Sequence, residues 1–155
     1  MKIKIDTNLS DDMPAEEVEI IIKASRECQI LNKIMESIQS ISNQIETITG
    51  TKENAISIIP VEEIFYFYSK EQGNYCKTQQ GDFKIKKKLY ELEEGLNKKE
   101  FIRISNACIA NVKHIKSFDL GMIGNIVVLF SDGTSQLVSK RRISNVIRFL
   151  KERGN

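Results

Sequence analysis

The sequence predicts a mainly β protein with short helices, an α+β fold of small antiparallel sheets preceded by a short strand–strand–helix segment. The first observation is that, from Ala55 onward, short β-branched and aromatic runs alternate with turn residues, which is typical of antiparallel strands. The second is an isoleucine repeat before this region whose spacing is helical. With 155 residues, the chain is long enough for one ordinary domain and a small appendage.

The amino-terminal segment is expected to contain two strands and a helix. Residues 2–6 alternate apolar and charged side chains, as a half-buried strand does, and residues 18–24 (VEIIIKA) favour a second strand antiparallel to the first. A helix follows, because isoleucines recur three or four positions apart at 30, 34, 38, 41, 45 and 48. This helix either packs on its own small sheet or forms a coiled coil, and both arrangements are compatible with a dimer surface.

A polar connection at residues 47–54 (TITGTKEN) marks the expected boundary between two parts, 1–50 and 51–155. The first part has five Lys and Arg against nine Asp and Glu, a balance of −4. The second has 18 against 12, a balance of +6. We therefore expect a polyanion as the partner of residues 51–155, and a dimerisation or partner-docking role for residues 1–50.

Residues 51–155 should form short strands with one central and one closing helix. Leucines at 89, 92 and 96 indicate the central helix, and the i, i+3, i+4, i+7 spacing of apolar residues from Ile143 to Leu150 indicates the closing one. Asp132-Gly133 predicts a hairpin turn. The expected strands are 56–59, 64–68, 75–79, 83–87, 101–104, 114–118, 125–130 and 134–138.

The stretch 101–115 (FIRISNACIANVKHI) begins as a strand and is interrupted by the polar pair Ser105-Asn106. Apolar residues then resume at 109, 112 and 115, which is helix-like or bent spacing. Ser and Asn compete with a strand ladder through their own side chains. Two interpretations follow from the residues: a tight turn or bulge, or a kink that holds Asn106 out for recognition.

Enzymatic and cofactor motifs are not found in the sequence. The single histidine, His114, has no Cys or Asp at ligand or triad spacing, and no glycine-rich phosphate loop or nucleophile elbow is present. Cys28, Cys76 and Cys108 are too scattered for a disulfide framework or a zinc site. We expect no catalysis, no cofactor and no small-molecule substrate. The start of the chain has no signal-peptide pattern and no apolar run is long enough to span a membrane, so a cytoplasmic location is expected.

Cations cluster at two places in the second part. Ser139, Lys140, Arg141 and Arg142 fall between the last strand and the closing helix, where a hydroxyl, three cations and free backbone N–H groups suit a phosphate. Cations at a helix start oppose the helix dipole, which favours a bound anion over a merely solvated patch. Residues 84–88 are also basic, and the solvent-exposed face of a strand is enough to explain that pattern.

Four stretches, in this order, resemble the LytTR-type DNA-binding domain of bacterial transcription regulators: IIPVEEIFYFYSKEQGNYCK, KLYELEEGL, EFIRISNACIANVKHIKSF and DGTSQLVSKRR. The resemblance runs from about Ser57 to Glu152. In the third stretch the matching positions, in order and spacing, are Phe101, Arg103, Ser105, Asn111 and Ile115. In this family a histidine is common where Ser105 stands, so the contact expected at that position transfers less directly.

The resemblance implies an elongated set of small antiparallel sheets that reads DNA through loops entering successive major grooves from one side and bending the duplex. Asn74, Asn106 and Arg141 would contact bases, because Asn pairs with adenine N6/N7 and Arg with guanine O6/N7. The residues expected to hold phosphates are Gln72, Ser105, Ser139, Lys140 and Arg142. Arg141 and Arg142 are adjacent, so the motif leaves open which of them reads a base.

The implied function is a sequence-specific, DNA-binding transcription regulator without a receiver domain, which binds double-stranded DNA as a homodimer or as two copies on repeated half-sites. Similar short family members are often paired with a membrane protein that restrains them. The alternative is a protein-interaction module on a LytTR-like scaffold that titrates a regulator or membrane partner.

Overall fold

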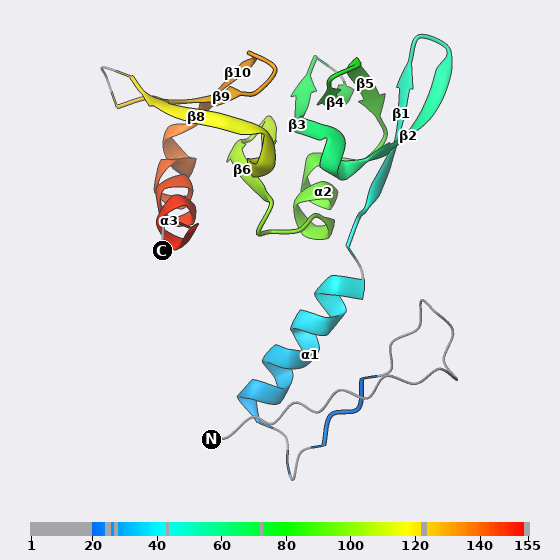
Figure 1. Ribbon diagram of the computed structural model, residues 1–155, viewed down its shortest axis with the longest axis vertical. Helices are drawn as coiled ribbons and strands as arrows, with labels where there is room; N and C mark the ends of the chain where they lie inside the picture. The colour runs from blue at the N-terminus through cyan, green and yellow to red at the C-terminus, as the bar shows by residue number, and fades with distance from the viewer. Residues whose placement is uncertain are drawn as a thin grey trace. The chain divides into compact units, whose positions relative to one another are not determined.

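The computed structural model describes residues 20–23, 26, 28–42, 44–71, 73–121 and 124–153. The chain divides into two compact units, residues 1–37 and 38–155, which are described separately. Helix α1 (Gln29–Ser42) crosses this division (Figure 1). The strand expected at residues 2–6 lies outside the described residues. Of the strand expected at residues 18–24, residues 20–23 are described, and they are not in a strand.

Helix α1 ends earlier than its isoleucine repeat predicts. The helix stops at Ser42, and the last isoleucine of the repeat, Ile48, lies in strand β1 (Thr47–Lys52). The β-branched threonines of β1 favour a strand. Ile48, between two of them, is only 2% exposed, so strand formation buries its side chain. The prediction of a polar connection at residues 47–54 is therefore wrong, and the expected boundary at residue 50 falls inside β1.

Seven antiparallel strands form the larger sheet, in the order β2-β1-β5-β4-β3-β7-β6. Helix α2 (Leu89–Gly95) follows β5, as the leucine spacing predicts. Short 3-10 turns, η1 (Val61–Glu63) and η2 (Val112–His114), precede β3 and β8. The strands besides β1 are β2 (Ala55–Pro60), β3 (Ile64–Lys70), β4 (Gly73–Thr78), β5 (Gly81–Ile85), β6 (Phe101–Ser105) and β7 (Cys108–Asn111).

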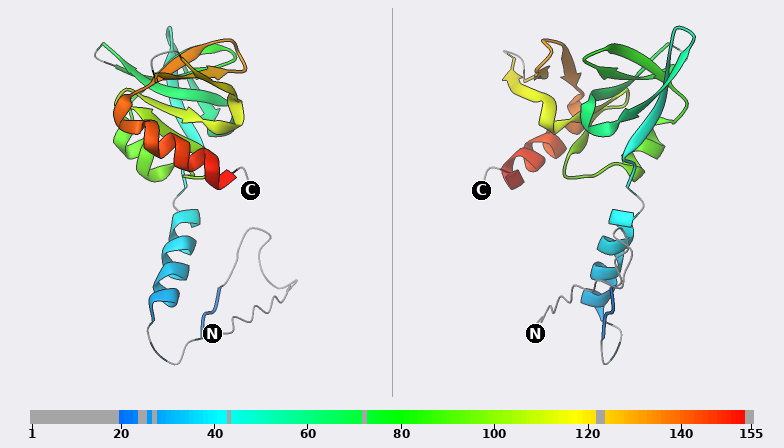
Figure 2. Two further views of the ribbon diagram at one scale, coloured as in Figure 1. Left: turned by 90° about the vertical axis from the view of Figure 1, so that its left-hand side faces the viewer. Right: turned by 45° about the vertical axis from the view of Figure 1, so that its right-hand side comes forward.

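Three further strands form a second antiparallel sheet, in the order β10-β9-β8. These are β8 (Ile115–Leu120), β9 (Ile126–Phe130) and β10 (Ser135–Val138). The turn predicted at Asp132-Gly133 joins β9 to β10, with Gly133 at a φ of 85° and the Asp132 Oδ1 atom accepting from the Thr134 backbone N–H. The 3-10 turn η3 (Lys140–Arg142) then leads into helix α3 (Ile143–Arg153), which confirms the expected closing helix (Figure 2).

Two apolar cores hold this arrangement together. In one, Leu92 of α2 is fully buried in a cluster that includes Phe67 and Phe83 of the larger sheet. In the other, Phe130 of β9 and Val146 of α3 share a cluster with residues of β3, β6 and β7. The larger sheet therefore contributes to both cores, and the mainly β, antiparallel fold class is confirmed.

The interruption at Ser105-Asn106 is a tight turn between two paired strands. Residues 106 and 107 form the turn, and the pairing of β6 with β7 shifts register between Arg103 and Ser105. The helix-like spacing after the turn is misleading, because residues 108–111 form strand β7. The interpretation as a tight turn with a register irregularity is therefore confirmed, and Asn106 is exposed at this turn.

Two polar side chains beyond the turn have structural roles. Asn111 is fully buried; its Nδ2 atom donates to the Ile64 carbonyl at 2.9 Å and its Oδ1 atom accepts from the Lys113 N–H at 3.0 Å. The His114 Nε2 atom lies 2.6 Å from the Glu62 carbonyl oxygen, so the tautomer with a proton on Nε2 donates there. The His114 ring also packs edge-on against Phe65. Its contacts are those of a residue that fixes the η1–η2 region.

Candidate nucleic-acid interface

Asn74, the first residue predicted to contact a base, lies near the start of β4 and is partly buried. Its Oδ1 atom accepts from the Ser69 hydroxyl at 2.6 Å, and its Nδ2 atom donates to the Lys87 carbonyl at 3.1 Å. An amide side chain has two donors and two acceptor lone pairs, so one of each remains for a further partner. The structure therefore gives Asn74 a structural role beside any role in recognition.

Asn106, the second predicted base-contacting residue, is exposed at the turn between β6 and β7. The Arg103 guanidinium holds this turn from below: its Nε atom donates to the Ser105 carbonyl at 2.6 Å and its Nη2 atom to the Asn106 carbonyl. The Ser105 hydroxyl accepts from the Ala107 N–H at 3.2 Å. These bonds fix the backbone of the turn, and no hydrogen bond of the Asn106 side-chain amide is recorded in the described part of the chain.

Ser69 of β3 joins these two positions. Its hydroxyl donates to Asn74, and its backbone N–H donates to the Ala107 carbonyl at 2.9 Å. Asn74 pairs with Ser69 across β3 and β4, and Tyr68 pairs with Cys108 across β3 and β7. Asn74 and the β6–β7 turn thus lie at the same end of the sheet, about 10 Å or two strand spacings apart.

The basic corner, defined as residues 139–142, is attached to the same edge. The Ser139 N–H donates to the Ile104 carbonyl at 2.9 Å, which extends the hydrogen bonding of edge strand β6 to the residue that precedes η3. Lys140 and Arg141 are exposed, and no ion pair is recorded for either in the described part of the chain. Arg142, by contrast, is half-buried, with its Nη1 atom 3.7 Å from the Glu93 carboxylate.

The connection between β5 and α2 adds positive charge through Lys86, Lys87 and Lys88. The sequence was compatible with an exposed strand face at this basic run. Strand β5 ends at Ile85, so these lysines lie in the connection to α2, and all three are exposed. The bond from Asn74 to the Lys87 carbonyl places this connection next to Asn74. In the sequence, the run KKKL does not alternate polar and apolar residues as a strand does, which indicates a connection at this place. Gln72, expected to hold a phosphate, lies outside the described residues.

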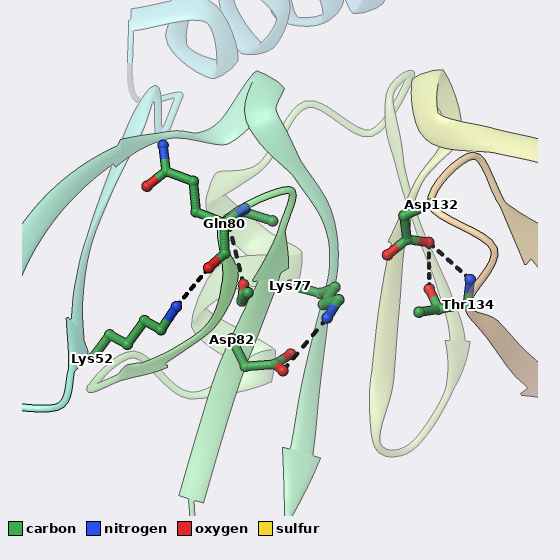
Figure 3. Close-up of polar contacts among 8 residues, drawn as sticks. Lys52, Lys77, Gln80, Asp82, Asp132 and Thr134 are labelled. Atoms are coloured by element: carbon green, nitrogen blue, oxygen red, sulfur yellow. Dashed lines mark hydrogen bonds and ion pairs between the residues drawn. The ribbon is translucent and has the colours of Figure 1, made fainter.

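Cations at the opposite end of the β4–β5 hairpin are engaged within the protein. The Lys77 ammonium is 3.5 Å from the Asp82 carboxylate, and the Lys52 ammonium donates to the Gln80 carbonyl at 2.6 Å (Figure 3). Asp132 and Thr134 likewise close their own turn through a side-chain bond of 2.6 Å. By contrast, no ion pair is recorded in the described part of the chain for Lys86, Lys87 or Lys88, which lie near Asn74 at the other end of the hairpin.

The buried thiols do not contribute reactive chemistry. Burial raises the pKa of Cys76 to about 12, and burial also raises the pKa of Cys108 to about 12. Both thiols stay protonated at neutral pH and are weak nucleophiles and metal ligands. Among the described residues, no cluster of His, Cys, Asp and Glu is arranged to hold a metal ion, and no helix is long and apolar enough to cross a membrane.

The exposed Asn106 amide and Arg141 guanidinium, both on turns, are groups that can hydrogen-bond to base edges, as in a nucleic-acid-binding domain. The family model for the LytTr DNA-binding domain matches residues 54–151. The chain therefore belongs to the LytTR DNA-binding domain family.

Relatives and a solved structure agree with this membership. Two Staphylococcus aureus proteins named HTH-type transcriptional regulators, from strain COL and from the bovine strain RF122, are 30% and 29% identical over 120 residues. Each alignment covers 74% of this chain and 81% of the relative. The LytTr DNA-binding domain of a Bacillus cereus regulator has the same fold, with a TM-score of 0.66 and 24% identity over 68% of this chain and 97% of that domain.

Proposed function

We propose that this protein is a sequence-specific transcription regulator that binds double-stranded DNA through the turns at one edge of its β scaffold. Family membership and the names of the Staphylococcus relatives support the class of function. The observation that supports the site is the pair of backbone bonds from Ser69 to Ala107 and from Ser139 to Ile104. Together they bring Asn74, Asn106 and the basic corner, three segments far apart in sequence, into one row.

The proposed contacts divide between bases and phosphates. Arg141 is the better candidate for a bidentate contact to guanine, because Arg142 already faces the Glu93 carboxylate whereas Arg141 is exposed. Asn106 presents its amide beyond a fixed backbone, which suits adenine. Lys140, Ser139 and Ser105 would contact phosphates, and Lys86, Lys87 and Lys88 join this group.

The row limits how the segments enter the duplex. Asn74 and the β6–β7 turn are about 10 Å apart, whereas equivalent positions of successive major grooves are about 34 Å apart along the duplex. These two segments would therefore enter the same groove, or the two neighbouring grooves that one phosphate backbone separates. Arg141 lies at the far end of the row from Asn74 and would make the contact furthest along the duplex.

Helix α1 would bring together the two copies needed for repeated half-sites. Along α1, Met35 and Ile41 are 44% and 71% exposed, so part of the apolar stripe is open to a partner. We propose that this stripe mediates homodimerisation and that a restraining membrane protein docks on the same helix. The described part of the domain carries the DNA-binding row, so the two roles are separable.

Fluorescence anisotropy tests the proposed function. A duplex is selected from a random pool with the full-length protein, and its binding is compared with that of a scrambled duplex across a salt series. We expect binding at least about a thousandfold tighter to the selected duplex, together with a steep decrease in affinity as salt rises. Equal and weak binding to both duplexes would overturn the proposal and favour the alternative of a protein-interaction module.

A further inference from the structure

Glu93 on α2 contacts two arginines that belong to different parts of the proposed interface. Its Oε2 atom accepts from the Arg103 Nη1 atom at 3.1 Å, and its Oε1 atom lies 3.7 Å from the Arg142 Nη1 atom. Arg103 lies under the β6–β7 turn, and Arg142 ends the basic corner. One carboxylate therefore lies between the two segments that are proposed to read DNA.

Arg103 transmits the position of Glu93 to the turn. Its side chain is only 12% exposed, and all three of its guanidinium nitrogens are engaged: Nη1 with Glu93, Nε with the Ser105 carbonyl and Nη2 with the Asn106 carbonyl. A guanidinium is planar and its donors have fixed directions. When the Glu93 carboxylate fixes the orientation of Nη1, it therefore also fixes the orientation of the Nη2 donor that holds the Asn106 carbonyl.

We infer that Glu93 is a positioning residue for recognition: it orients the Asn106 turn through Arg103 and holds Arg142 until a DNA phosphate replaces the carboxylate. This inference rests on the proposed function. Without the carboxylate, two guanidinium groups face each other with no intervening anion, and like charges repel. The turn and the basic corner would then both move from their relative positions.

The inference differs from what charge alone predicts. Removing an acidic group near a DNA-binding surface should strengthen binding to every duplex, because it removes repulsion from phosphates. If Glu93 positions the turn, its removal should strengthen binding to scrambled DNA while weakening binding to the selected sequence. The two effects have opposite signs, so a ratio of affinities separates them.

The test compares Glu93→Gln with Glu94→Gln. Glu94 is the next residue on α2, is exposed, and has no recorded ion pair or hydrogen bond in the described part of the chain, so its substitution removes the same charge without the contacts. We expect the affinity ratio of selected to scrambled duplex to fall about tenfold in Glu93→Gln, the size of one weakened base contact. Glu94→Gln should leave the ratio unchanged. Arg103→Lys, which keeps the charge but not the planar fork, should reproduce the loss.

A measurement on the free protein separates this inference from the proposed function. In amide NMR spectra without DNA, Glu93→Gln should shift the resonances of Asn106, Ala107, Lys140 and Arg141, whereas Glu94→Gln should not. Shifts confined to α2 would overturn the coupling whatever the DNA result. An unchanged affinity ratio in Glu93→Gln would overturn its role in recognition. A wild-type protein that does not discriminate between the duplexes would instead refute the proposed function, and the role in recognition with it.

Discussion

Arg141 and Arg142 are neighbours with identical chemistry, and the structure distinguishes them by their surroundings. Arg142 faces Glu93, whereas Arg141 is exposed and has no recorded ion pair in the described part of the chain. The sequence left these two residues as equal candidates, because a carboxylate about fifty positions earlier decides between them. The same holds for Arg103. The sequence showed that it belongs to the motif, but its hydrogen bond to the turn depends on its contact with Glu93 of α2, which only the fold reveals.

Arg141→Ala should weaken binding to the selected duplex and relax the preference at one base position, because a bidentate base contact carries about 1–3 kcal/mol of discrimination. Lys140→Ala should weaken binding to all duplexes alike and reduce the salt slope by about one. Anisotropy with single-base variants of the site, in a salt series, measures both effects. Indistinguishable behaviour of the two variants would refute the assigned roles.

Substitutions of Asn111 and Asn106 should have different effects, the first on stability and the second on DNA recognition. Asn111→Ala removes the partner of the buried Ile64 carbonyl and is expected to lower the free energy of unfolding by about 1–3 kcal/mol. Asn106 lies at an exposed turn and its recorded hydrogen bond uses its backbone carbonyl, so Asn106→Ala should change the free energy of unfolding by less than about 0.5 kcal/mol. Urea unfolding measures both values.

The DNA affinities of the same two variants complete the comparison. Asn106→Ala should lose preference for the selected duplex, while folded Asn111→Ala should retain it. A stable Asn106→Ala variant that still discriminates fully between duplexes would remove Asn106 from the proposed interface.

At the scale of elements, period-two alternation and turn residues predicted the second part well. The central helix, the closing helix and the Asp132-Gly133 hairpin are confirmed, and the observed strands differ from the predicted ones mainly at their ends. Two errors came at β7, where helix-like spacing concealed a strand, and at β1, where isoleucines at helical spacing continued into a strand. Spacing alone does not show that Ile48 is buried between strands, which is a property of the sheet and not of the local sequence.

Gly50 provides a test of β1. A Cβ atom at this position would lie 2.8 Å from Ile59 Cδ1 and 2.8 Å from Phe83 Cβ, so Gly50→Ala requires these core residues to shift. We expect a loss of about 1–3 kcal/mol in the free energy of unfolding, typical of overpacking. Gly121→Ala is the control, because its nearest neighbour would be 3.4 Å away. Equal stability of the two variants would contradict the placement of β1 in the sheet core.

For the whole molecule, the division of the chain changes how the amino-terminal unit should be removed. Ile45 packs against the first core, and its N–H donates to the Gly95 carbonyl at 2.8 Å. The domain that carries the DNA-binding row therefore begins before β1. The sequence predicted two parts with different charge, but composition could not show that the sheet starts on the acidic side of the boundary.

Two truncations test this division. Removal of residues 1–43 should leave a folded, monomeric domain with the thermal stability of the full chain. Removal of residues 1–50 deletes most of β1, including the buried Ile48, and should lower the melting temperature markedly. Analytical ultracentrifugation and thermal unfolding measure both properties. A dimer that survives removal of residues 1–43 would contradict the proposed role of α1.

The central claim is that Asn74, the β6–β7 turn and the basic corner form one DNA-binding row. It is tested most directly by titrating the selected duplex into isotopically labelled protein and following backbone amide resonances. We predict shifts concentrated at residues 73–74, 105–107 and 139–142, with the opposite hairpin end at residues 79–80 unchanged. Shifts at residues 79–80 without shifts in the three segments would place the DNA elsewhere and contradict the account.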